Sequence, residues 1–224
     1  MRAGQKLIAS DGKEVMLFPL SYMYISQGEN ESFSHAGILA IDFLGWGESG
    51  RINRCPYYAP CKCKLVYQQT SAYYNIWESV DKVHTPMGLT YVSFWVQHDN
   101  TLPYSVGTIL EQGDLLGRTG DAGYATGDHL HFNTADSKYV GQVQMPPDNN
   151  WELKNSQHVY DICYVNDTVL VKDYNYNWRT YSGGINPSKY NKSNFPWVLY
   201  ARRLRDKRYW HFVSFNLYYC KRRI

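Results

Sequence analysis

The stretch Thr90-Tyr91-Val92-Ser93-Phe94-Trp95-Val96, at residues 90–96, decides the fold class. It is a run of β-branched and aromatic residues, which favour strands. Similar short runs occur at 64–67, 115–116 and 129–132, with glycines and prolines between them. Short strands at close spacing, separated by such turn residues, indicate an antiparallel β domain. We therefore predict a mainly β protein built on an antiparallel β-sheet.

Helical periodicity is scarce along the chain, and the best helical candidates are short, at residues 71–77 and 197–204. The composition changes at residues 145–150, where two prolines and two asparagines favour a linker or domain edge. We predict a β domain at about 15–145. A small C-terminal α+β or β region would follow at 146–224, with strands at 169–171 and 210–215.

The bulk composition indicates a folded chain with a basic end. The sequence has 224 residues, of which 44% are hydrophobic and 19% charged, so global disorder is excluded. Eight basic residues and only one acidic residue follow position 200, and the preceding part is left with a net charge of about −4. Such an end can meet nucleic acid, an anionic wall polymer or an acidic partner subunit, or it can simply solubilise or dock the chain. We prefer the interpretation that this basic end solubilises or docks the chain.

Three further patterns bear on the setting of the protein. The five cysteines are an odd number, and Cys61 and Cys63 are too close for a zinc knuckle, so we predict reduced, structural thiols. The first residues contain no apolar run typical of a signal peptide. No stretch approaches the ~18 apolar residues of a membrane span. We expect a protein that is made without a signal peptide or membrane span.

The pair His129-Leu130-His131 is the first sign of a chemical site. Residues i and i+2 of a strand point to one face, so both imidazoles would enter one space while Leu130 and Phe132 form an apolar stripe behind them. A glycine-rich loop at 117–127 precedes the pair and permits close backbone approach. Alone, a His-x-His pair does not establish a metal site.

Asp42 and two more histidines extend this pattern. Asp42 lies within the apolar run 38–44, where a carboxylate is costly unless it is paired or binds a metal. His35 is seven residues earlier, so the chain must turn, at Gly37, for both to bind one ion. His98 lies two residues after the end of the run at 90–96. Two imidazoles and one carboxylate with an open fourth position are typical of catalytic zinc, and the remaining imidazoles would handle protons or oxyanions.

In this order the motifs resemble those of the lysostaphin/LytM-type zinc endopeptidases of peptidoglycan. Residues 125–132, Ala-Thr-Gly-Asp-His-Leu-His-Phe, are similar to that family's "sTGxHLHF" signature. Residues 58–66 resemble its "xAPxxGxV" stretch, with Cys63 where glycine is usual. The resemblance covers roughly residues 20–135. It implies a Zn²⁺ cofactor, an antiparallel sheet and loops that form a substrate groove.

The resemblance also assigns roles to the site residues. It implies that the zinc ligands are His35, Asp42 and His131, and that the catalytic imidazoles are His98 and His129. Six residues separate His35 from Asp42, where the family usually has three. This spacing is similar to that of D-Ala-D-Ala dipeptidases and carboxypeptidases, but those need a downstream Glu-x-x-His, and Arg208 occupies the Glu position before His211. We therefore retain the endopeptidase interpretation.

The expected function is hydrolysis of a peptide bond in the stem or cross-bridge of bacterial peptidoglycan. The composition and the unfamiliar C-terminal region favour a phage protein, either a lysin on the virion tail or one released from the host cytoplasm at lysis. The expected partners are peptidoglycan and phage tail proteins, the latter bound through the C-terminal region, with no nucleic acid. The alternative is a non-catalytic structural or wall-binding component of a phage tail. We interpret His84, His158 and His211 as ordinary histidines.

Overall fold

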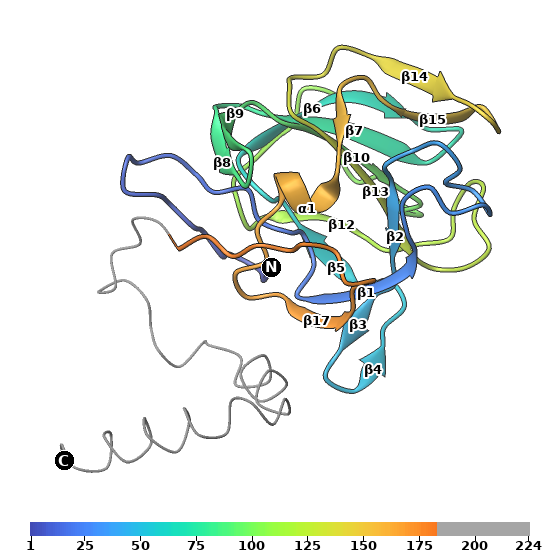
Figure 1. Ribbon diagram of the computed structural model, residues 1–224, viewed down its shortest axis with the longest axis horizontal. Helices are drawn as coiled ribbons and strands as arrows, with labels where there is room; N and C mark the ends of the chain where they lie inside the picture. The colour runs from blue at the N-terminus through green and yellow to red at the C-terminus, as the bar shows by residue number, and fades with distance from the viewer. Residues whose placement is uncertain (183–224) are drawn as a thin grey trace. The chain divides into compact units, whose positions relative to one another are not determined.

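A computed structural model describes residues 1–182 of the chain. The helix predicted at 197–204, the strand predicted at 210–215, His211, Cys220 and the basic end all lie outside the described residues. Within residues 1–182 there are seventeen strands and one short helix, α1 (Val159–Ile162). The prediction of a mainly β protein is therefore confirmed, and Figure 1 shows the many strands and the single short helix.

One large sheet carries most of the strands. Its order is β11-β6-β7-β10-β13-β2-β1-β17, and β16 also pairs with β13. The bounds are β11 (Ile109–Leu110), β6 (Cys63–Gln69), β7 (Tyr74–Ser79), β10 (Ser93–Gln97), β13 (Leu130–Ala135), β2 (Ile41–Phe43), β1 (Tyr22–Gln27), β17 (Val169–Lys172) and β16 (Ser156–Gln157). All of these pairs are antiparallel except β1 with β17. The predicted antiparallel sheet is thus present.

Four two-stranded ribbons surround this sheet. They are β12 (Leu115–Arg118) with β5 (Pro56–Tyr58), β14 (Gln142–Met145) with β15 (Asn150–Leu153), β3 (Trp46–Gly47) with β4 (Gly50–Arg51), and β8 (Val83–Thr85) with β9 (Gly88–Thr90). The strands expected at 115–116 and 169–171 are confirmed as β12 and β17. No helix among the described residues is long and apolar enough to cross a membrane.

The helix predicted at residues 71–77 is wrong. A turn ends at Tyr73, and β7 begins at Tyr74 and pairs on both sides, with β6 and with β10. Asn75, Ile76 and Trp77 are all buried in this central strand. A seven-residue window rich in apolar residues is ambiguous between helix and strand, and here the two flanking strands decide the outcome.

The sheet also extends past the boundary predicted near residue 145. Beyond it, β16 pairs with β13, and β17 pairs with β1. Before residue 15, Met1 and Leu7 pack in one cluster with Val15 and Leu17. The described residues therefore form part of a single compact unit, whose edges differ from the predicted range 15–145.

The core lies on the face of β13 opposite the paired histidines. Leu130 and Phe132 are fully buried, and Phe132 packs against Phe94 of β10 with ring centroids 6.0 Å apart. This is the apolar stripe predicted from the His-x-His pattern. The cysteines among residues 1–182 are all free and buried, as expected for structural thiols, and they are Cys55, Cys61, Cys63 and Cys163.

Candidate metal centre and groove

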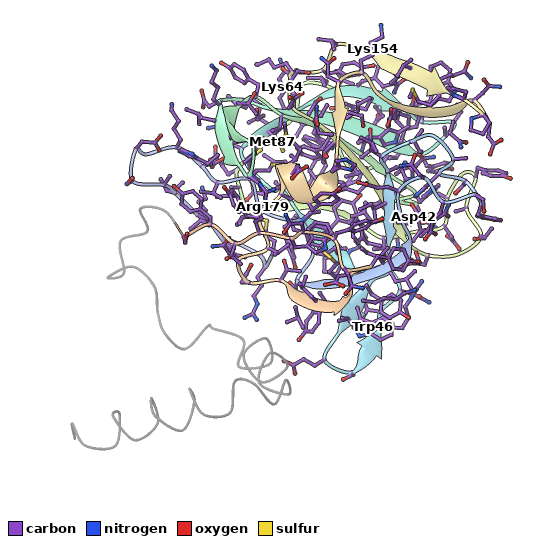
Figure 2. All side chains as sticks on the ribbon, viewed as in Figure 1. Asp42, Trp46, Lys64, Met87, Lys154 and Arg179 are labelled. Carbon is purple, nitrogen blue, oxygen red and sulfur yellow. The ribbon has the colours of Figure 1, made fainter. Side chains whose placement is uncertain are left out.

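Strand register brings two of the predicted ligands together. Asp42 of β2, which is labelled in Figure 2, is the direct cross-strand partner of His131 of β13. Side chains at directly opposite positions have Cβ atoms about 4.5–5.5 Å apart, so the carboxylate and the imidazole meet without any help from loops. His131 Nδ1 lies 3.0 Å from Asp42 Oδ1.

The same register continues across six strands and forms what we call the polar rung. Gln69 pairs with Tyr74, Tyr74 with Gln97, Gln97 with His131, His131 with Asp42, and Asp42 with Gln27. All six members of the polar rung line one groove of about 780 Å³. Since cross-strand partners share a face of the sheet, this single row of polar side chains forms the groove floor.

His35 reaches the centre through a tight turn. The His35 carbonyl accepts a hydrogen bond from Ile38 N at 3.0 Å, and Gly37 adopts a φ of +78° between them. A Cβ atom at Gly37 would lie 2.0 Å from the Pro146 carbonyl oxygen, so this position needs glycine for both conformation and space. The turn that the odd His35–Asp42 spacing requires is therefore present at Gly37.

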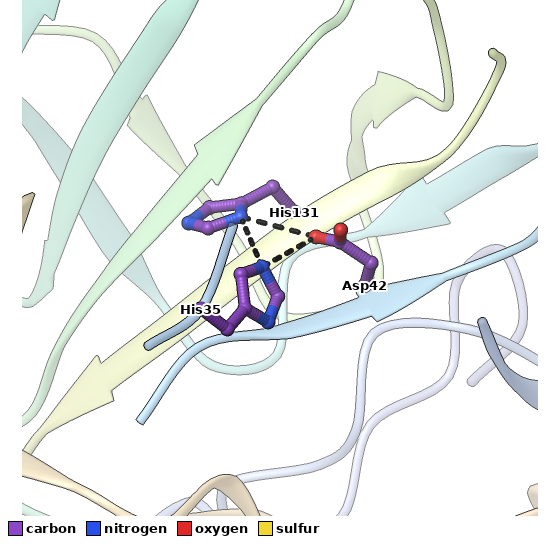
Figure 3. A group of neighbouring side chains, drawn as sticks. All are labelled: His35, Asp42 and His131. Atoms are coloured by element: carbon purple, nitrogen blue, oxygen red, sulfur yellow. Dashed lines mark hydrogen bonds and ion pairs between the residues drawn. The ribbon is translucent and has the colours of Figure 1, made fainter. Parts of the chain in front are cut away.

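The three predicted ligands converge on one point (Figure 3). His35 Nε2 lies 3.3 Å from His131 Nδ1 and 3.3 Å from Asp42 Oδ1, and the third side of the triangle is 3.0 Å. His35 is 1% exposed, Asp42 7% and His131 9%. We call this the ligand triangle, and within residues 1–182 it is the group of histidine, cysteine and carboxylate side chains placed to hold a metal ion.

Hydrogen bonding shows what the ligand triangle needs. His35 Nδ1 lies 2.9 Å from the Gly28 carbonyl oxygen, so Nδ1 donates and a neutral His35 has only a lone pair at Nε2. That lone pair faces Asp42 Oδ1, which is also an acceptor. Two acceptors in contact repel unless a cation lies between them, and a metal ion or a proton can supply that charge.

The pKa values follow the same logic. Burial lowers the pKa of His35, but the hydrogen bond and charge of Asp42 outweigh it and the pKa lies above its ordinary value. Burial alone would raise the pKa of Asp42, whereas hydrogen bonds with His131 and His35 hold it well below its usual range. Burial keeps the pKa of His131 below its ordinary value, although Asp42 opposes it. The Asp42 carboxylate therefore stays ionised, and its negative charge favours a cation beside it.

The donor set fits zinc. Two imidazole nitrogens and one carboxylate oxygen are ligands that catalytic zinc uses, with a fourth position left for water or substrate. Ligand atoms about 2.0–2.1 Å from a tetrahedral zinc lie about 3.3–3.4 Å from one another. The sides of the ligand triangle, 3.0–3.3 Å, are close to that spacing.

The other two predicted residues, His98 and His129, lie beside the ligand triangle and line the groove. Their ring centroids are 4.4 Å apart, and His129 Nε2 is 3.6 Å from Asp42 Oδ2. His98 Nδ1 donates to the Ala122 carbonyl at 2.8 Å, and His129 Nδ1 to the Gly127 carbonyl at 2.7 Å. Each ring therefore keeps Nε2 as an acceptor. Burial, reinforced by His129 and His131, lowers the pKa of His98 to about 4.

Several positioning residues were missed in the sequence. Gln27, in the amide orientation that satisfies its surroundings, accepts from Ser34 N at 2.9 Å and His35 N at 3.2 Å. Asp128 precedes the paired histidines and accepts from Thr119 Oγ1 at 2.5 Å and Arg54 N at 3.0 Å. Alternation along β10 places Gln97 on the same face as Trp95, so the groove position of Gln97 could have been predicted from the sequence. No local pattern in the sequence indicates the roles of Gln27 or Asp128.

The remaining candidates have other contacts. His84 pairs with Asp11 at 2.9 Å and His158 with Glu29 at 2.6 Å, away from the ligand triangle. Asn100 bonds Arg54 and Asp121, whereas the ring of His98 is held by Ala122. Tyr124 is 91% exposed at the groove rim.

Comparison with known proteins adds a phage relative. No protein-family model matches the chain. The protein named morphogenesis protein 1 of Bacillus phage B103 is 40% identical over 174 residues, which cover 76% of this chain and 46% of that protein. The match thus spans about half the length of this curated relative.

Solved structures that match include three peptidases. The catalytic domain of lysostaphin from Staphylococcus simulans is 19% identical, with 61% of this chain and 88% of that chain covered and a TM-score of 0.40. The catalytic domain of the prophage-encoded M23 protein EnpA from Enterococcus faecalis is 13% identical, with 63% and 92% covered and a TM-score of 0.41. A zinc-containing peptidase from Vibrio cholerae is 18% identical, with 58% and 42% covered and a TM-score of 0.41.

Proposed function

We propose that this chain is a zinc metalloendopeptidase that hydrolyses a peptide bond in the stem or cross-bridge of bacterial peptidoglycan. The observation that carries the proposal is the juxtaposition of the ligand triangle with His98 and His129 on the floor of one groove. Three buried ligand atoms leave one side open, and two imidazoles with available Nε2 atoms lie beside it. The resemblance of residues 125–132 to the lysostaphin/LytM signature supports the choice of substrate.

In this proposal His35, Asp42 and His131 hold Zn²⁺, and His98 and His129 are the catalytic residues. Bound zinc supplies a Lewis acid that polarises the scissile carbonyl and lowers the pKa of water. His129, whose Nε2 lies 3.6 Å from Asp42 Oδ2, would accept a proton from the attacking water through Nε2 and then return it to the leaving amine. His98, with its Nδ1 donating to the Ala122 carbonyl, would accept a hydrogen bond through Nε2 from the attacking water and so orient it.

The phage setting is part of the same proposal. A relative named for morphogenesis in a Bacillus phage supports a phage-encoded protein that opens the wall from the virion tail or at lysis. The region predicted at 146–224 would dock to tail proteins or bind the wall. Among the described residues of that region, β16 and β17 join the main sheet, so the docking surface must use what these strands leave exposed.

The test is digestion of purified cell walls by the zinc-loaded protein, with mass spectrometry of the released fragments. We expect new peptide ends and no newly cut glycan. Addition of a chelator should abolish release, and re-addition of Zn²⁺ should restore it. His129→Ala should retain zinc but release fragments about 10²–10⁴-fold more slowly. A zinc-loaded protein that binds walls but cuts none would favour the non-catalytic alternative.

A further inference from the structure

The lining of the groove carries almost no formal charge outside the ligand triangle. Among the described residues that line it, Asp42 is the only carboxylate, and there is no lysine, arginine or glutamate. The other polar contributions are imidazoles, hydroxyls and carboxamides. The one negative charge is already compensated, because Asp42 lies within 3.3 Å of His35 and 3.0 Å of His131. Outside the ligand triangle, the described lining therefore offers no ionic partner for a charged group of a substrate.

Carboxamide side chains line the groove where a charged substrate group would need a side chain of opposite charge. Gln97 is fixed in place, since its Oε1 accepts from Trp95 Nε1 at 3.1 Å and its Nε2 donates to the Ala72 carbonyl at 3.2 Å. Gln142 is held by the Tyr74 hydroxyl. A carboxamide has two donor hydrogens and two acceptor lone pairs, so each of these side chains retains capacity for the N–H and C=O groups of a bound peptide.

Aromatic rings make up the rest of the surface along the polar rung. Tyr74 stacks on Trp95 with ring centroids 4.2 Å apart and on Tyr67 at 5.9 Å. At the rim, Phe33 is 73% exposed and Trp151 50%. Rings of this kind bind neutral, apolar or amide groups well, whereas a carboxylate placed against them loses its water without gaining a counter-ion.

We propose that the groove selects peptide segments that carry no charge on the residues adjoining the scissile bond. Where such a residue has a carboxyl group, the substrate is the carboxamide form rather than the free carboxylate. The inference rests on the proposed endopeptidase function and names the class of substrate for it. It identifies Gln97, the direct cross-strand partner of His131, as a specificity-determining residue.

The experiment compares two forms of one wall. Purified sacculi are used either untreated or after carbodiimide coupling with ammonia, which converts free carboxylates into carboxamides. Mass spectrometry counts each new peptide end per minute, and a glycosidase applied to both walls controls for altered texture. We expect cuts only at bonds flanked by uncharged residues, so that any bond beside a free carboxylate is cut at least tenfold faster after amidation.

The outcomes separate this inference from the function it rests on. Cuts at a naturally neutral bridge, or at bonds that need amidation, support the inference. Equal cutting beside a free carboxylate in both walls overturns it and leaves the endopeptidase function standing. No new peptide end from either wall overturns both. The wall digest therefore decides each case.

A matched pair of variants at Gln97 tests the physical cause. Gln97 is the direct cross-strand partner of His131, and its side chain is half-buried. Gln97→Lys adds the missing counter-ion and should reduce the preference for amidated bonds severalfold. Gln97→Met has similar length without charge, loses the same hydrogen bonds to Trp95 and Ala72, and should keep the preference. An unchanged preference in Gln97→Lys, with the protein folded by circular dichroism, would contradict a role for groove charge.

Discussion

The ligand triangle is assembled in two different ways. Asp42 and His131 lie on neighbouring strands, and their contact follows from the backbone hydrogen bonds that set the register of β2 and β13. His35 lies in a loop, and its position depends on side-chain contacts from the end of β1 and on contacts that its loop neighbours make with residues beyond 145. Two ligands are thus held by the sheet and one by side chains and loop packing.

The supports of the loop come from several segments. Gln27 holds the backbone amides of Ser34 and His35, and Gly28 accepts the hydrogen bond from His35 Nδ1. Beyond residue 145, Asn150 Nδ2 donates to the Ala36 carbonyl at 3.2 Å, and Glu152 Oε2 accepts from Leu39 N at 3.0 Å. The difference teaches that the metal centre can be weakened from the loop side without any change to the sheet.

The largest effect is expected from removal of a ligand held by the sheet. His131→Ala should lose stoichiometric zinc and all measurable wall digestion, because only two of the three protein ligands remain. Metal analysis by mass spectrometry, with digestion assays on the same sample, measures both. Retention of zinc by this variant would refute the assigned ligand set.

A change to the turn should weaken the centre from the loop side. Gly37→Ala must accommodate a φ of +78° and a Cβ atom 2.0 Å from the Pro146 carbonyl oxygen. We expect zinc affinity to fall about 10–100-fold, the range seen when groups that orient metal ligands are lost. Competition titration with a zinc-binding dye measures this.

The matched control for this turn is Gly12→Ala. Gly12 has a φ of +81°, and a Cβ atom there meets nothing within 4 Å. It should cost about 1–2 kcal/mol of stability from the left-handed backbone alone, with zinc affinity unchanged. Equal zinc affinity in the two variants would show that the turn at Gly37 does not position His35.

A smaller effect is expected beside the paired histidines. Asp128→Ala removes the bonds to Thr119 and Arg54 that hold the approach to His129. The sheet should still hold Asp42 against His131, so zinc content should stay unchanged while kcat falls about tenfold. Asp121→Ala, in the same loop but bonded to Asn100, is the control. Zinc loss in Asp128→Ala would mean that register alone is insufficient.

The smallest effect concerns Glu152 and has a defined pH dependence. Burial raises the pKa of Glu152, although Leu39 N–H and Ser156 oppose it. A group with a raised folded-state pKa stabilises the fold below its unfolded pKa and loses that contribution as pH rises through the folded value. Glu152→Gln should therefore gain up to about 1 kcal/mol at pH 7.5 and nothing at pH 4. Thermal melts of chelator-treated protein at both pH values test this, and a gain at pH 4 alone would contradict it.

The side-chain directions of the site residues on strands could be predicted from the sequence. For His35, which lies in a loop, only the need for a turn could be predicted. Alternation in His129-Leu130-His131 predicts two imidazoles on one face and Leu130 in the core, because side-chain direction is a local property of a strand. The need for a turn at Gly37 follows from the odd spacing between His35 and Asp42. Which residues hold that turn does not, since Asn150 and Glu152 contact it from 114 and 113 residues away in the sequence.

The errors in the fold have the same origin. Residues 71–77 form a turn and a strand because β6 and β10 lie on either side of β7, and neither neighbour is visible in a seven-residue window. The sheet extends past residue 145 because β17 pairs with β1, about 147 residues earlier in the chain. Local composition correctly marks a turn at Pro146 and Pro147, between β14 and β15, but a turn is not a domain edge.

The polar rung has a consequence for divergence among related chains. Its members lie on six strands whose backbone pairing does not depend on their side chains, and only Asp42 and His131 belong to the ligand triangle. Substitution at Gln69, Tyr74 or Gln97 changes what lies along the groove while leaving register and ligands in place. Under the proposed function, substrate range can therefore change by single codon changes while the three ligand residues stay constant.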